Sequence, residues 1–98
     1  MTLPRWLMVV DAEVDPDVET AWNEWYDTVH LPEIADCPGF EEAARYVSEV
    51  DGQRHYIAVY ALSGPEALDS PEFAARRGWA QFAGRVRATV RAHRRLIP

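Results

Sequence analysis

The sequence predicts an α+β domain with the element order β-α-β-β-α-β, in which a four-stranded antiparallel sheet carries both helices on one face. Three observations predict this order. A helical segment follows an apolar strand, an Asp51-Gly52 hairpin signal separates two strand-like runs, and a regular apolar–polar alternation begins at Arg85. At 98 residues the chain is expected to be a single domain, 1–98, with a modest core.

The first strand is expected from Arg5 to Glu13, because its residues are apolar on both parities as far as Val10. A helix should follow. Asp15 is its expected N-cap, Pro16 suits its first turn, and it should run to about His30, after which Pro32 either interrupts it or sets up a short extra turn. Helical spacing predicts a buried face made of Val18, Ala21, Trp22, Trp25 and Val29.

The second half should begin with a hairpin whose strands are Phe40–Val50 and His55–Leu62. Ser70, with Pro71 and Glu72 after it, is expected to cap a second helical region interrupted at Gly78. Its expected core anchors are Phe73, Trp79 and Phe82.

The alternation in the tail favours a fourth strand over a continued helix, with Val86, Ala88, Val90 and Ala92 on one face. Both helices then cover the same face of the sheet, and the other face stays bare. Whichever parity is chosen, the bare face carries apolar or aromatic side chains, which is unusual for a monomer. A homodimer is therefore expected, with two sheets closing into a shared barrel around interior cavities.

Composition excludes several function classes. The formal net charge is −6, with an acidic first half and an arginine-rich second half, which favours complementary surfaces over nucleic-acid binding. The chain has no run of 18 apolar residues and no signal-peptide pattern, so no membrane partner and a cytoplasmic location are expected. A single cysteine, three scattered histidines and isolated glycines predict no metal and no nucleotide cofactor.

Three short motifs carry a resemblance to a known group. They are Trp25-Tyr26-x-x-x-His30-Leu31-Pro32, Pro38-Gly39-Phe40 and Ala44-Arg45-Tyr46. Together with the element order, they resemble the EthD-like branch of the dimeric α/β-barrel, ferredoxin-like superfamily. The resemblance implies a homodimer with one pocket per subunit, either between helices and sheet or inside the barrel, and a histidine at the pocket mouth. It does not define the reaction, because this fold hosts many activities.

The first helix supplies the strongest candidate residues, since Asn23, Tyr26 and His30 fall on one edge. His30 suits general acid–base catalysis, and its expected place at a helix C-terminus would favour the protonated ring; the alternative is a capping histidine. Tyr26 either donates a proton to a substrate carbonyl or packs at the rim of the core. Asn23 either orients Tyr26 or the substrate, or is solvated.

The second candidate group lies on the strands. Arg45 and Tyr46 point to opposite sheet faces, so one should face the cavity, and a mid-sheet arginine needs an anionic ligand or a carboxylate partner such as Asp11. Trp25 is expected to contribute an aromatic wall. His55, His93 and Cys37 are expected to have no catalytic role.

The leading hypothesis is a small cofactor-independent enzyme that acts by proton transfer on an aromatic or polyketide-like molecule, as a lyase or isomerase. Dehydration, cyclisation, isomerisation and decarboxylation all fit. A cofactor-free monooxygenase of the same fold is the first alternative. A non-catalytic module that binds a hydrophobic ligand is the second.

Overall fold

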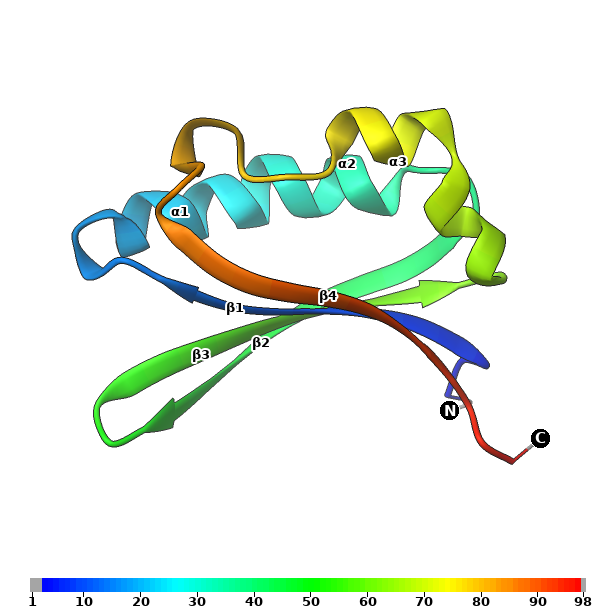
Figure 1. Ribbon diagram of the computed structural model, residues 1–98, viewed down its shortest axis with the longest axis horizontal. Coiled ribbons are helices and arrows are strands. Elements are labelled where there is room, and N and C mark those ends of the chain that lie inside the picture. Colours follow the sequence, from blue (N-terminus) through cyan, green and yellow to red (C-terminus); the bar gives the residue numbers. More distant parts are fainter. Residues whose placement is uncertain (1–2, 98) are drawn as a thin grey trace.

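The computed structural model describes residues 3–97 as two layers, helices above and a curved sheet below (Figure 1). The strands are β1 (Trp6–Val14), β2 (Phe40–Val50), β3 (Gln53–Leu62) and β4 (Val86–Arg94). The first helical run comprises η1 (Pro16–Val18), α1 (Glu19–Trp25), η2 (Tyr26–His30) and α2 (Leu31–Ala35). The second comprises η3 (Pro65–Asp69), α3 (Pro71–Arg76) and η4 (Ala80–Phe82).

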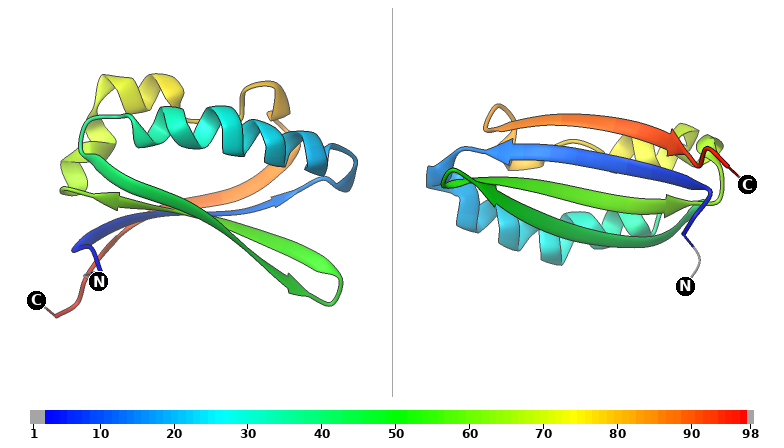
Figure 2. Two further views of the ribbon diagram at one scale, coloured as in Figure 1. Left: turned by 180° about the vertical axis from the view of Figure 1, so that it is seen from behind. Right: turned by 90° about the horizontal axis from the view of Figure 1, so that it is seen from below.

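The four strands form one antiparallel sheet in the order β2-β3-β1-β4, which confirms the predicted β-α-β-β-α-β fold. The helices cover only one of its faces, and Figure 2 (right) shows the other face uncovered. The β2–β3 hairpin turns at Asp51 and Gly52, as the sequence predicts, and both residues have the positive φ angles, 53° and 78°, that a two-residue hairpin turn favours.

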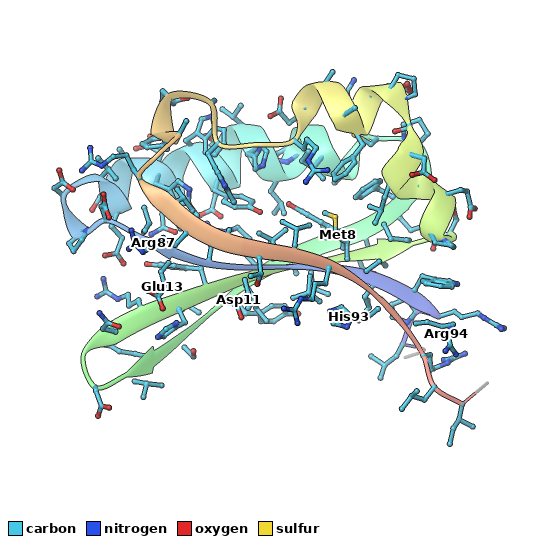
Figure 3. The ribbon with its side chains drawn as sticks, in the orientation of Figure 1. Met8, Asp11, Glu13, Arg87, His93 and Arg94 are labelled. Atoms are coloured by element: carbon cyan, nitrogen blue, oxygen red, sulfur yellow. The ribbon has the colours of Figure 1, made fainter. Side chains whose placement is uncertain are left out.

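The helix-facing side of the sheet holds the core, and the parity left open by the sequence is now defined. Its residues on β1 and β3 are Met8, Val10, Ala12, Val14, Tyr56, Ala58, Tyr60 and Leu62, all at most 9% exposed. The alternate positions Leu7, Val9, Ile57 and Val59 face the bare side. Figure 3 shows Met8 on the helix side of β1, opposite Asp11. The β3 tyrosines therefore pack inside, and the centre of the bare face is aliphatic.

The first helical run continues past His30 to Ala35, so of the two outcomes expected at Pro32 the structure has the short extra turn. Residues Tyr26–His30 form one π-helical turn, in which the Leu31 N–H donates to the carbonyl of Tyr26, five residues earlier. Pro32 has no N–H, and its ring would clash with the preceding turn of a regular α-helix. The wide turn accommodates the proline without ending the helix.

The π turn also changes which residues are buried. The buried positions are Trp22, Tyr26, His30 and Ile34, spaced by four residues. An inserted residue advances the helix by more than the regular 3.6 residues per turn, so the predicted stripe drifts off the core. The prediction for Val29 is therefore wrong, since it is 47% exposed. The prediction for Ala21 is also wrong, but Ala21 precedes the π turn and is exposed because the buried side of α1 is centred on Trp22.

The two helical starts differ in how they are capped. Ser70 accepts a hydrogen bond from the Phe73 N–H at 3.1 Å, which confirms the predicted cap. Asp15 makes no side-chain cap bond. Its two carboxylate oxygens instead accept hydrogen bonds from Arg85 and Arg87, each at 2.8 Å. The acidic N-terminal half thus pairs with the basic C-terminal half inside one fold, and it ties the start of the first helix to β4.

Candidate active site

A cavity of about 90 Å³ lies between the helices and the sheet. Its lining residues are Met8, Val10, Tyr26, His30, Ile34, Tyr60, Phe73, Arg77, Gly78, Trp79 and Val90. Two of them, Tyr26 and His30, are the first and last residues of the π turn. The resemblance left two places open for the pocket, and this cavity occupies the one between helices and sheet.

His30 is 4% exposed, and aromatic rings surround it. Its ring stacks on Trp25 at 4.6 Å between centroids with an interplanar angle of 14°, and Tyr26 and Trp79 contact it at steeper angles. Its Nδ1 lies 3.1 Å from Oε1 of Glu33, three residues later in the chain. Because the helix continues past it, His30 does not cap a helix end.

Burial lowers the pKa of His30, and the nearby guanidinium of Arg45 adds to this effect. The Glu33 carboxylate opposes the shift but does not overcome the desolvation. The expected preference for a protonated ring is therefore wrong, since it assumed a helix C-terminus that the structure does not have. In the tautomer in which Nδ1 donates to the Glu33 carboxylate, Nε2 keeps a free lone pair.

Two tyrosine hydroxyls meet beside the histidine. The Tyr26 and Tyr60 oxygens lie 3.1 Å apart and share a hydrogen bond. Burial raises the pKa of both phenols. Both groups therefore stay protonated at neutral pH; one hydroxyl donates to the other, and the second keeps a proton that it can donate to an oxygen in the cavity.

Arg45 faces the helix side of the sheet, but it does not line the cavity. Its guanidinium donates to Oδ1 of Asp27 and to Oδ1 of Asn23, both at 2.7 Å, and lies 4.3 Å from the Tyr26 ring centroid. The Nδ2 of Asn23 in turn donates to the Tyr56 hydroxyl at 3.0 Å. Arg45 and Asn23 thus link the first helix to the β2–β3 hairpin, and the Arg45 guanidinium packs against the Tyr26 ring.

The other predicted site residues lie outside the cavity. Asp11 is exposed on the bare face, opposite Arg45, so the expected Asp11–Arg45 ion pair is wrong and Asp27 takes its place. Tyr46 also lies on the bare face, at 57% exposure, beside a groove of about 400 Å³. Trp25 packs behind His30 and against Phe82. Of the seven predicted residues, the structure brings only Tyr26 and His30 to the cavity.

Three polar residues at this site were not predicted from the sequence to lie there. Glu33 carried a signal, because its i+3 spacing from His30 places the two side chains on one helix face. Tyr60 and Arg77 carried none, since their position at the cavity depends on strand parity and on the turn after α3. Trp79 was expected only as a core anchor, and it also lines the cavity.

Two features concern partners and metals. Among residues 3–97, no group of three or more His, Cys, Asp or Glu side chains could hold a metal ion. Within the same range, no helix is long and apolar enough to cross a bilayer.

The sheet order and the helices on one face define a ferredoxin-like α+β fold. A family model described as "Domain of unknown function (DUF4286)" matches residues 6–83. The chain belongs to that family. No curated protein matches it.

Solved structures agree with this class. HapK from Hahella chejuensis superposes with a TM-score of 0.69 at 15% identity, covering 93% of this chain and 92% of HapK. An ethyl tert-butyl ether (EthD) family protein from Bacillus halodurans gives 0.66 at 19% identity, covering 93% and 99%. SnoaB from Streptomyces nogalater, a cofactor-independent oxygenase, gives 0.67 at 13% identity, covering 96% of each chain. The predicted ferredoxin-like fold is thereby confirmed, one of these structures belongs to the EthD family, and at these identities the likeness is one of fold.

The lowered pKa of His30 predicts a specific pH dependence of stability. The folded state binds fewer protons than the unfolded state, so the free energy of unfolding should fall as the pH drops below the unfolded value of 6.5 toward the folded pKa. Asp15 and Glu19 have lowered pKa values from ordinary values of 3.8 and 4.5, so their contribution is lost only at lower pH. Urea unfolding from about pH 7.5 to about pH 5 measures the effect.

His30→Gln should flatten this part of the profile. His93→Gln is the matched control, because it removes an exposed imidazole on β4 and should leave the slope unchanged. An unaltered slope in a folded His30→Gln variant would show that His30 is not buried in its neutral form.

Proposed function

We propose that this protein is a cofactor-independent enzyme that moves a proton on a small molecule, with His30 as the general base. The supporting observation is the state of that ring. It is neutral, its Nδ1 is held by Glu33 at 3.1 Å, and it lines a cavity. A carboxylate that fixes the tautomer of a histidine leaves the opposite nitrogen ready to accept a proton.

The chemistry fits a carbonyl substrate. Nε2 of His30 takes a proton from the carbon next to the carbonyl, the C–H electron pair becomes the enolate, and the negative charge collects on the carbonyl oxygen. The hydroxyl of the Tyr26–Tyr60 pair whose proton is not used within the pair donates to that oxygen. Protonated His30 then returns the proton to another atom, which completes an isomerisation, or assists the departure of a hydroxyl, which completes a dehydration.

The cavity volume limits how much of a substrate can enter. Drug-sized ligands occupy pockets of roughly 300–1,000 Å³, and this cavity measures about 90 Å³. An aromatic or polyketide-like molecule therefore places only its reactive end between helices and sheet. The remainder lies outside the cavity mouth.

Deuterium exchange tests the proposal without knowledge of the natural substrate. The wild type should catalyse exchange of the acidic C–H protons of acetoacetate and pentane-2,4-dione in D₂O, followed by ¹H NMR. His30→Gln should slow the exchange by roughly 10²–10⁴-fold, the usual contribution of a general base. Tyr26→Phe should slow it less, because Tyr60 remains as a donor.

His93→Gln serves as the control, because this histidine lies on β4 and does not line the cavity. Equal exchange rates in the wild type and a folded His30→Gln variant would remove His30 from the mechanism. The absence of exchange by the wild type, with the probes bound in the cavity, would favour a ligand-binding module without catalysis.

A cofactor-free monooxygenase is the second candidate. It is supported by structural relatives described as a cofactor-independent oxygenase and as antibiotic biosynthesis monooxygenases. The same base would deprotonate the substrate, and the carbanion would then reduce oxygen. Oxygen uptake in aerobic assays, lost in His30→Gln, would favour this reaction over proton transfer alone.

We further propose that the protein works as a homodimer closed through the bare face of its sheet. Leu7, Val9, Ile57 and Val59 form an aliphatic centre there, and no helix covers it (Figure 2). Burying such a patch against a second copy removes apolar area from water on both sides. The cavity holding His30 lies on the opposite side of the sheet, so each subunit keeps its own site.

Ile57→Asp should convert the dimer to a monomer, because the new charge would be buried in the interface. Val47→Asp is the matched control: Val47 is 58% exposed and its register with Tyr56 places it on the helix side. Sedimentation equilibrium measures the mass. A monomeric wild type at micromolar concentration would contradict the proposed dimer.

A further inference from the structure

One cation at the mouth of the cavity has no partner of its own. Arg77 directly follows α3, is exposed, and lines the cavity beside Phe73, whose ring centroid lies 5.3 Å from its guanidinium carbon. Within residues 3–97, no carboxylate forms a salt bridge with it. The neighbouring Arg76 differs, since it donates to the carbonyl of Glu33 at 3.0 Å and faces Asp36.

The rest of the cavity wall carries no charge at neutral pH. Its side chains are mainly hydrophobic, and its polar members are the two tyrosine hydroxyls and the neutral imidazole of His30. A single free guanidinium beside an apolar hollow complements a molecule with one apolar end and one anionic end. The chain as a whole carries a formal charge of −6, so it does not attract anions in general. Anion preference at this site must therefore come from a local group.

We propose that Arg77 binds the anionic group of the substrate, and that the substrate is a small carboxylic acid whose compact apolar or carbonyl-bearing end enters the cavity. This inference rests on the proposed function, because it takes the same cavity as the substrate site. A guanidinium presents two parallel N–H groups to a carboxylate. Held by these at the mouth, the molecule directs its other end toward His30 and the tyrosine pair.

The volume sets the size of the buried end. A cavity of about 150 Å³ in another protein holds a benzene molecule, and this cavity measures about 90 Å³. A short aliphatic or carbonyl-bearing chain is therefore a better fit than a fused ring system. The carboxylate stays in contact with water and with Arg77.

Binding of a matched pair of probes tests the inference. Butyrate and its neutral analogue butyramide have the same short chain, so their difference reports on the charge. NMR titration at low salt, observing the Trp79 indole and the His30 ring, should show butyrate binding roughly tenfold or more tighter than butyramide. Arg77→Gln should abolish this preference, and Arg77→Lys should restore part of it.

Arg54→Gln is the charge-matched control. Arg54 is an exposed arginine at the hairpin end of β3, paired with Glu19 and absent from the cavity wall. The inference is overturned, with the cavity site intact, if the preference for butyrate survives Arg77→Gln or is lost equally in both variants. If neither probe shifts the two reporter signals, the cavity takes no such ligand and the proposed function falls with the inference.

Discussion

The wide turn at Tyr26–His30 is the constraint on which the candidate site depends. Pro32 prevents a regular α-helix from continuing, and the π turn absorbs the conflict with the Leu31 N–H bound to the Tyr26 carbonyl. The added residue rotates the downstream helix, so that His30 rather than Val29 faces the sheet. π turns of this kind occur frequently at functional sites, where they direct a side chain that a regular helix would expose.

Arg45 holds this turn in place on the sheet. Its guanidinium bonds Asp27 within the turn and Asn23 one turn earlier, and it lies over the ring of Tyr26. A largely buried guanidinium is tolerable only when its donors are paired, and both partners come from the first helix. The residue that the sequence suggested as a substrate ligand is thus a structural link between β2 and the helix, and it supports Tyr26 without lining the cavity.

The order of elements along the chain, the hairpin turn and the Ser70 cap follow from local sequence patterns. These patterns are period-two alternation, an Asp-Gly turn pair, and a hydroxyl before Pro71. The phase of the first helix does not follow from such patterns. Periodicity assumes 3.6 residues per turn, and one π turn invalidates the assumption for every residue beyond it. The predicted preference for a protonated His30 ring was wrong for the same reason, because the helix end expected at His30 lies five residues later at Ala35.

Long-range contacts explain the remaining differences. Tyr60 and Arg77 reach the cavity because strand parity and the turn after α3 bring them there, and neither is set by neighbouring residues. The Asp11–Arg45 pair does not form because the two residues occupy opposite faces of one sheet. Asp15 does not cap the helix because Arg85, just before β4, and Arg87, within β4, bind its carboxylate. Local rules predicted the scaffold, and the site required knowledge of which faces meet.

General-base catalysis by His30 requires a neutral imidazole in one fixed tautomer inside the cavity. Nitrogen-15 NMR of the His30 ring near neutral pH tests this most directly, because the two ring nitrogens report protonation separately. The predicted spectrum shows a protonated Nδ1, bound to Glu33, and an unprotonated Nε2. A doubly protonated ring, or a ring with its proton on Nε2, would contradict the account.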